Sequence, residues 1–158
     1  MPNIPSVNLS DFISDDLSLK QDFVNKLGKA YQEIGFVALK GHFLKDSDNK
    51  NIYKYIKKFF DLPKNIKCKY ELKGFAGQRG YTSFGKEHAK GKKHGDLKEF
   101  WHFGQYLDES EYLKFGYPKN LTVNELPEFN KIGKKVYKSL EKTSIYVLRA
   151  ISLFLGLK

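Results

Sequence analysis

The sequence contains one cysteine, two arginines and no long apolar run. A single cysteine, Cys68, excludes an intrachain disulfide and a zinc site built from several thiolates. Because no Cys-His signature surrounds Cys68, we expect it to have no chemical role. A membrane-spanning helix needs roughly 20 apolar residues, and no stretch approaches that length. The first residues also lack the basic-then-apolar order of a signal peptide, so the sequence predicts a cytoplasmic protein.

Apolar and aromatic residues, in contrast, are plentiful. Of the 158 residues 41% are hydrophobic, and they include 13 Phe and 10 Tyr. This supply is enough for one buried core and too small for two ordinary domains. The sequence therefore predicts a single globular domain over residues 1–158.

Positive charge is concentrated in one segment of the chain. The net charge is +10, and residues 50–93 hold thirteen bases against three acids. Aromatic residues lie between these bases, as in platforms that bind single-stranded nucleic acid. However, 26 of the 28 bases are lysines, whereas base and phosphate recognition favours arginine. We therefore favour a solvated lysine face, with an anionic small-molecule substrate nearby. A basic module at 50–93 that binds nucleic acid or an acidic partner remains the alternative.

Two short apolar segments in the first quarter of the chain predict strands. Apolar and polar residues alternate over 4–9, and Pro5 suits the start of an edge strand. The continuous apolar run 36–39 predicts a second strand, buried on both faces. Both strands are short, so they predict a small sheet at most.

Apolar residues at three- and four-residue spacing predict the helices. Ser18 and Gln21 form the pattern of a capping box at the start of the first helix. Pro63 ends the second helix and opens the third. The predicted helices span about 19–34, 52–60, 64–71 and 126–155.

Between the third and the last of these helices the sequence changes character. Residues 73–95 contain six glycines among polar and basic residues, which predicts an extended basic loop with a short strand near 81–84. A further strand is expected over 98–103, and a loop over 106–119. The mixture of helices and short strands predicts an α+β fold.

Several short motifs follow one another in a fixed order. They are Ile4-Pro5-x-Val7-x-Leu9, Gly35-Phe36, Gly41-His42, Phe59-Phe60-Asp61-Leu62-Pro63 with Lys67, Gly80-Tyr81, Asp96-x-Lys98-Glu99-Phe100 and Leu155-Gly156-Leu157. In this order they resemble the N-terminal domain of the isopenicillin N synthase-like family of 2-oxoglutarate- and Fe(II)-dependent non-haem dioxygenases. The resemblance covers nearly the whole chain. Phe43 departs from it, because many members have a glycine there.

The resemblance implies how this α+β chain would fit into a larger enzyme. Helices would flank a few short strands that join a double-stranded β-helix, or jelly roll, supplied by a missing C-terminal part. In the family, two histidines and a carboxylate of that jelly roll hold Fe(II), and an arginine binds 2-oxoglutarate. The complete enzyme would oxidise a small organic substrate. We expect no catalytic residue, metal ligand or bound cofactor in this chain, and no activity when it is alone.

One tripeptide of the chain imitates part of the iron motif. His94-Gly95-Asp96 spells His-x-Asp, but the one later histidine, His102, is too close to act as the distal ligand. Arg149 is not in an Arg-x-Ser pattern, and the aspartate already begins the Asp-x-Lys-Glu motif. His42 and His88 have no paired ligand at a useful spacing. We therefore assign no iron ligand.

The resemblance places substrate contact in the segment around Gly80-Tyr81, which leans over the open end of the jelly roll. Arg79 and Tyr81 are thus the candidate substrate-binding residues, through charge-assisted or aromatic contacts. The alternatives are that Tyr81 packs beneath the loop and that Arg79 is solvated. Lys98 and Glu99 are expected to pair with other parts of the chain and to stabilise the fold.

Overall fold

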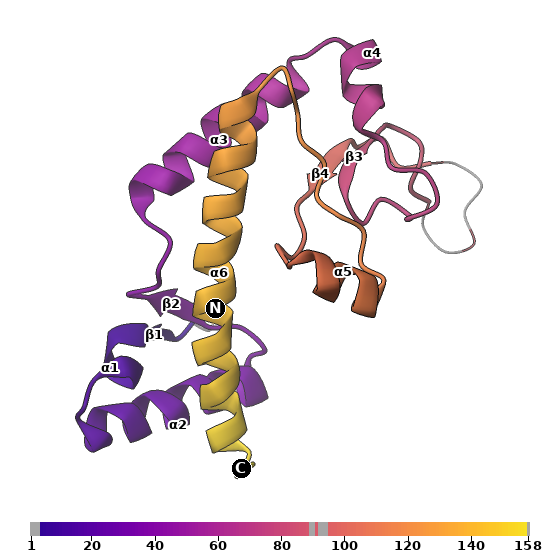
Figure 1. Ribbon diagram of the computed structural model, residues 1–158. Coiled ribbons are helices and arrows are strands. Elements are labelled where there is room, and N and C mark those ends of the chain that lie inside the picture. Colours follow the sequence, from indigo (N-terminus) through magenta and orange to yellow (C-terminus); the bar gives the residue numbers. More distant parts are fainter. Residues whose placement is uncertain (1–3, 89–90, 92–94, 158) are drawn as a thin grey trace. The chain divides into compact units, whose positions relative to one another are not determined.

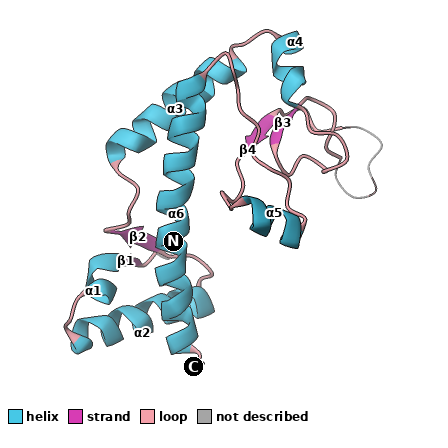
Figure 2. Ribbon diagram, in the orientation of Figure 1, coloured by secondary structure: helices cyan, strands magenta, loops and turns pink. Residues whose placement is uncertain are grey.

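A computed structural model describes residues 4–88, 91 and 95–157. Its elements are β1 (Ser6–Asn8), α1 (Leu9–Ile13), α2 (Leu17–Glu33), β2 (Ala38–Lys40), α3 (Asp46–Phe60), α4 (Lys64–Lys67), the 3₁₀ helix η1 (Cys68–Tyr70), β3 (Gly80–Thr82), β4 (Phe100–His102), α5 (Glu109–Phe115) and α6 (Pro127–Phe154). Helices predominate and the strands are short (Figures 1 and 2). The fold is therefore α+β, as the sequence predicts.

The residues gather into two compact units. The first unit consists of Met1–Lys45 and Lys138–Lys158, and the second unit is Asp46–Tyr137. Helix α6 lies within the range predicted for the long helix, and its residues belong partly to each unit. A single domain over 1–158 stays a prediction, as does a cytoplasmic location. No helix in the described part of the chain is long and apolar enough to cross a membrane.

The first unit contains a two-stranded parallel sheet. Its register pairs Ser6 with Ala38, Val7 with Leu39 and Asn8 with Lys40. The expectation that the second strand is buried on both faces is wrong, because Ala38 and Lys40 are exposed and Phe36 is 69% exposed. A strand is buried on both faces only where other elements cover both faces of its sheet, and the face of β2 that carries Ala38 and Lys40 is uncovered. Leu39 alone of its three side chains packs against the core.

Helices enclose the core of the first unit. Leu9 of α1 and Leu27 of α2 are fully buried, and Ala150 of α6 packs in the same cluster. Gly28 allows α2 and α6 to approach closely, because a Cβ at this position would lie 2.2 Å from the Phe154 ring. Apolar burial of this kind is worth about 25 cal/mol per Å², so these contacts hold the helices on the sheet.

The start of α2 differs from the predicted capping box. Asp16, and not Ser18, is the N-cap residue, and its carboxylate accepts the backbone N–H groups of Ser18 at 2.8 Å and Leu19 at 3.1 Å. The helix therefore begins at Leu17. Helix α1 was not expected from the sequence, although Asn8 caps it by accepting the N–H of Ser10, as Asn does at many helix starts.

Aromatic rings form the core of the second unit. The fully buried Phe59 ring of α3 stacks on Phe129 of α6 with 5.3 Å between centroids. Trp101 of β4 and Tyr81 of β3 meet the same ring edge-on at 4.8 and 5.8 Å. Offset and edge-on pairs are the favoured aromatic geometries, so Phe59 fixes α3, the two strands and α6 around one centre.

Strands β3 and β4 lie where strands were predicted and pair antiparallel. Their register pairs Gly80 with His102, Tyr81 with Trp101 and Thr82 with Phe100. The preceding helix is shorter than predicted, because α4 ends at Lys67 and the chain continues as a tighter 3₁₀ turn.

The segment 106–119 was predicted to be a loop, and this is wrong because it contains α5. Asp108 and Glu111 form a capping box at its start, and Gly116 ends it with a left-handed conformation at φ 65°. Both signals are visible in the sequence, but the helix has only seven residues and therefore shows no clear apolar period.

Candidate functional site

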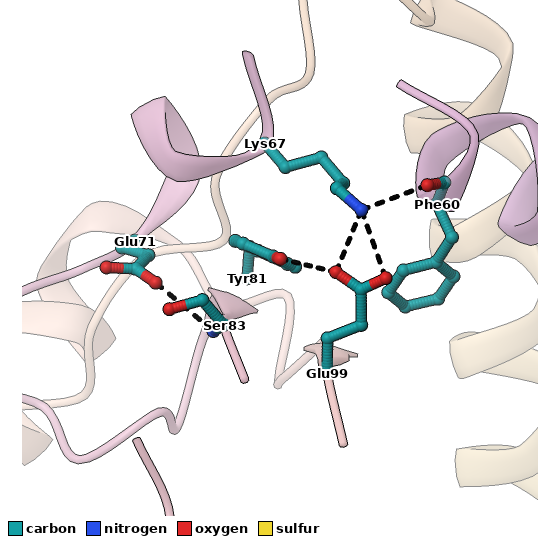
Figure 3. Close-up of polar contacts among 6 residues, drawn as sticks. All are labelled: Phe60, Lys67, Glu71, Tyr81, Ser83 and Glu99. Carbon is teal, nitrogen blue, oxygen red and sulfur yellow. Dashed lines mark hydrogen bonds and ion pairs between the residues drawn. The ribbon is translucent and has the colours of Figure 1, made fainter. Parts of the chain in front are cut away.

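A buried polar cluster joins three separate segments of the second unit (Figure 3). Lys67 Nζ donates to the two Glu99 carboxylate oxygens at 2.8 and 3.0 Å, and to the Phe60 carbonyl oxygen at 3.0 Å. The Tyr81 hydroxyl donates to the same carboxylate. Only 9% of the Lys67 side chain and 16% of the Glu99 side chain are exposed. We call these four residues the Lys67 cluster; each of its charges is paired, as burial demands.

Local structure brings each member of the cluster to its place. Lys67 is the last residue of α4, whose start is set by Pro63. Tyr81 is the middle residue of β3, and Glu99 directly precedes β4. The antiparallel pairing of these two strands carries Tyr81 and Glu99 to one point (Figure 3).

The carboxylate of a second acidic residue, Glu71, also stabilises β3. Glu71 accepts the backbone N–H of Ser83 at 3.1 Å, which ties the chain after η1 to the end of β3 (Figure 3). Glu71 also forms a bridge with Gly80 at the start of β3. The strand is thus held at both ends.

The cluster shifts the acidity of its members. Burial alone would raise the pKa of the Glu99 carboxyl, but the hydrogen bonds from Lys67 and Tyr81 hold that pKa below its usual value of 4.5. Burial first, and then the hydrogen bond to Glu99, raises the pKa of the Tyr81 hydroxyl. Glu99 is therefore an anion and Tyr81 a neutral donor at neutral pH.

Arg79 is buried as well, with 7% of its surface exposed. Its guanidinium donates to the Gln78 carbonyl oxygen and to Gln105 Oε1, both at 2.7 Å, while its Nε has no partner among the described residues. Gly104 makes room for it, because a Cβ there would lie 1.7 Å from Arg79 Cζ. The alternative of a solvated Arg79 is wrong. No carboxylate of the described residues forms an ion pair with this cation.

Tyr81 has only 2% of its surface exposed, and its hydroxyl is engaged by Glu99. This agrees with the alternative that Tyr81 packs beneath the loop. Tyr81 also lies in the wall of an open pocket of about 530 Å³, whereas Arg79 is not among the described residues of that wall. The structure therefore does not bring the two candidates into one site, and substrate contact by either stays a prediction.

Lys98 and Glu99 both form ion pairs, but with different partners. Glu99 joins the Lys67 cluster, whereas Lys98 pairs with Glu87 at 2.5 Å and Asp96 at 3.3 Å near the surface. The Lys67–Glu99 pair is the more important for the fold, because surface pairs contribute about 0–1 kcal/mol.

The donor set of the described residues does not fit iron(II). Their His, Cys, Asp and Glu side chains include no group of three that can hold a metal ion, whereas a facial triad needs two histidines and a carboxylate. His94 lies outside the described residues, and the Asp96 carboxylate pairs with Lys98. His102 Nδ1 lies 2.6 Å from the Gly77 carbonyl oxygen, so that nitrogen holds the loop. No chemical step on iron is assigned to these residues.

Comparison with known families decides the identity of the chain. The family described as "non-haem dioxygenase in morphine synthesis N-terminal" matches residues 4–128, well over half of the sequence. The chain belongs to this family. The three segments joined by the Lys67 cluster all lie inside the matched range, so the cluster is part of the non-haem dioxygenase N-terminal domain.

Several curated relatives of the chain carry the name 2-oxoglutarate-dependent dioxygenase. The chain is 29% identical to a homoarginine-6-hydroxylase of Oryza sativa subsp. japonica over 97% of this chain and 49% of the relative. It is 30% identical to the 2-oxoglutarate-dependent dioxygenase thnC of Trichoderma harzianum, over 90% of this chain and 44% of that protein. The chain thus spans about half the length of the curated relatives it matches.

Solved structures agree with the family. A 2OG-Fe(II) oxygenase family protein of Caulobacter crescentus superposes on the whole chain with a TM-score of 0.81 and 32% identity, and half of its own chain is covered. A full-length Neurospora crassa protein in complex with alpha-KG gives a TM-score of 0.75 at 23% identity, with 98% and 44% of the two chains covered. The second likeness shows the fold alone. The sequence-based recognition of the dioxygenase family is confirmed.

Proposed function

We propose that this chain is the scaffold and substrate-entrance part of a 2-oxoglutarate- and Fe(II)-dependent oxygenase that oxidises a small organic substrate. Family membership and the match to about half of each relative support this function. The Lys67 cluster is the observation that carries it. The cluster ties together three of the motifs on which the family resemblance rests, and one of its members, Tyr81, lines an open pocket.

The scaffold role follows from the buried contacts of β3. Lys67 and Glu99 hold Tyr81 from one side, and Glu71 holds Ser83 at the end of the strand (Figure 3). A strand fixed in this way positions the loop that precedes it. In the proposed enzyme, a C-terminal jelly-roll domain supplies the Fe(II) and 2-oxoglutarate sites, and this loop shapes the path of the substrate toward them.

Arg79 and Tyr81 remain the proposed substrate contacts in the complete enzyme. An unpaired guanidinium is costly to bury, and its planar fork suits a carboxylate. Arg79 therefore fits a carboxylate that approaches when the enzyme is complete. Tyr81 would contribute its ring, since its hydroxyl is already bound to Glu99.

Nucleic-acid binding by residues 50–93 is not favoured by the structure of this segment. Lys67 is buried, and Lys57, Lys69 and Lys86 pair with acidic side chains. These pairs reduce the free positive charge that phosphate binding needs. A basic binding module therefore stays the second interpretation and is not part of the proposal.

Anaerobic calorimetry of the 158-residue chain with Fe(II) and 2-oxoglutarate tests the proposal. We expect no stoichiometric binding in the anaerobic titration and, in a separate assay with O₂ present, no succinate formation by the chain alone. A chimera in which the chain replaces the matching half of the Caulobacter crescentus relative should form succinate when a substrate is present. Stoichiometric binding by the chain alone that is lost in a His94→Ala variant would contradict the proposal.

A further inference from the structure

The last part of α6, yellow in Figure 1, is apolar on two sides. On one side Ala150 is fully buried in the core of the first unit, and Val147 and Phe154 pack against that core. On another side, residues recur at intervals of four, four and seven, which places them on one face of a helix. These residues are Leu140, Ser144, Leu148 and Leu155, and we call them the α6 stripe.

The leucines of the α6 stripe are strongly exposed. The exposed fraction is 48% for Leu140, 64% for Leu148 and 61% for Leu155. Single apolar residues at a protein surface are common, but large ones aligned on one helix face indicate an interaction surface. A helix that is apolar on more than one side is normally covered on more than one side. The α6 stripe therefore has the character of an interface.

The polar groups on and around the α6 stripe are already satisfied within the first unit. Lys142 Nζ lies 3.9 Å from the centroid of the Phe43 ring, and the Arg149 guanidinium lies 5.7 Å from that of Tyr146. The Ser144 hydroxyl, which belongs to the stripe, donates to the Leu140 carbonyl oxygen at 2.9 Å, as serines in helices often do. An apolar partner can thus cover this hydroxyl without leaving it unpaired.

The relatives indicate what covers such a surface. The Caulobacter crescentus oxygenase superposes on all of this chain with a TM-score of 0.81, and half of its own chain lies outside the superposition. A complete enzyme of this kind therefore has a second half of similar size. A sheet, like a helix, buries its apolar face against another element. The jelly-roll sheet of the proposed enzyme would offer such a face.

We propose that the α6 stripe is the docking surface for the C-terminal half of the complete oxygenase, and that an apolar face of the jelly-roll sheet covers Leu148 and its neighbours. This inference rests on the proposed function and deepens it, because it names the surface through which the scaffold holds its partner. The stripe belongs to the first unit, whereas the Lys67 cluster and Arg79 belong to the second unit. Both units thus contribute to the scaffold role.

Thiol labelling in the chimera with the Caulobacter crescentus relative tests this inference. In a Cys68→Ser background, Leu148→Cys places one thiol in the stripe. Leu153→Cys is the matched control, because Leu153 is 53% exposed and lies on the same helix about 140° around the axis from Leu148. Both thiols should react rapidly with N-ethylmaleimide in the 158-residue chain alone. In the chimera, the thiol at position 148 should react roughly tenfold more slowly, and the thiol at position 153 should react as before.

Thermal unfolding gives a second measurement. Leu148→Lys should leave the midpoint of the isolated chain nearly unchanged, because this side chain is exposed there. In the chimera the same change buries an unpaired cation, so the midpoint should fall by roughly 3 °C or more. Leu153→Lys should change neither midpoint.

Equal labelling at position 148 in the chain and the chimera would overturn the inference, and so would a chimera that does not unfold cooperatively. Slow labelling in the isolated chain that becomes faster on dilution would assign the stripe to a second copy of the chain, which also overturns it. The proposed function is tested separately. Succinate formation with an unprotected thiol would refute the docking surface alone, whereas a protected thiol without succinate formation would count against the oxygenase function alone.

Discussion

Replacing Lys67 by methionine should destabilise the chain far more than an ordinary lysine substitution. The change keeps most of the side-chain volume but leaves the Glu99 carboxylate buried without its cation and the Phe60 carbonyl without its donor. Removing one member of a fully buried ion pair costs about 3–5 kcal/mol. Because 16% of the Glu99 side chain is exposed and Tyr81 still donates to it, we expect a loss of about 2–3 kcal/mol.

Thermal unfolding followed by circular dichroism measures this loss. For a chain of this size, 1 kcal/mol corresponds to roughly 2–4 °C, so Lys67→Met should lower the midpoint by roughly 4–12 °C. Lys57→Met is the control, because Lys57 forms a pair with Asp61 in which both side chains are more than half exposed, and it should cost at most about 1 kcal/mol. The double variant Lys67→Met, Glu99→Met should recover much of the loss. If the Lys67 and Lys57 variants unfold at the same temperature, the cluster does not hold the fold.

Three further predictions concern other charges of the second unit. Folding lowers the pKa of the Glu99 carboxyl, so the stabilisation that the Glu99 carboxylate contributes is present above pH 4.5 and is lost as the pH falls through the pKa of the folded state. The difference in unfolding midpoint between wild type and Lys67→Met should therefore shrink on acidification. A difference that does not change with pH would contradict this prediction. Arg79→Met should change the free energy of unfolding by no more than about 1 kcal/mol, because the loss of two hydrogen bonds is offset by the removal of an unpaired buried cation. Urea unfolding measures this change. A larger loss would show that the guanidinium stabilises the fold. Asp108→Ala should speed hydrogen exchange of the backbone amides in α5 without changing the midpoint of thermal unfolding, because Asp108 caps that helix. Unchanged exchange would contradict the capping role.

The long helices could be predicted from the sequence because their signals are local and repeated. Helix α6 has 28 residues, so its apolar period is sampled many times. Helix α5 has seven, and its only signals are the caps at Asp108, Glu111 and Gly116. Those three residues mark a helix when they are considered together, whereas apolar spacing alone misses it.

The candidate site could be predicted only in part, because its contacts join distant segments. Lys67 and Glu99 are 32 residues apart, and no spacing rule relates them. The family motifs drew attention to both, but their partnership depends on the fold.

Two buried cations of the second unit show how structure separates a stabilising role from a functional one. The Lys67 ammonium donates to the Glu99 carboxylate and to the Phe60 carbonyl oxygen, and the Tyr81 hydroxyl donates to the same carboxylate. The charge of Lys67 is therefore compensated within the chain. Arg79 is equally buried but has two neutral acceptors and an Nε without a described partner. A folded chain gains nothing from burying an uncompensated guanidinium, and groups that reduce stability concentrate at functional sites. Arg79 therefore stays the proposed contact for a carboxylate of the substrate, whereas Lys67 stabilises the strand beside it through its pair with Glu99.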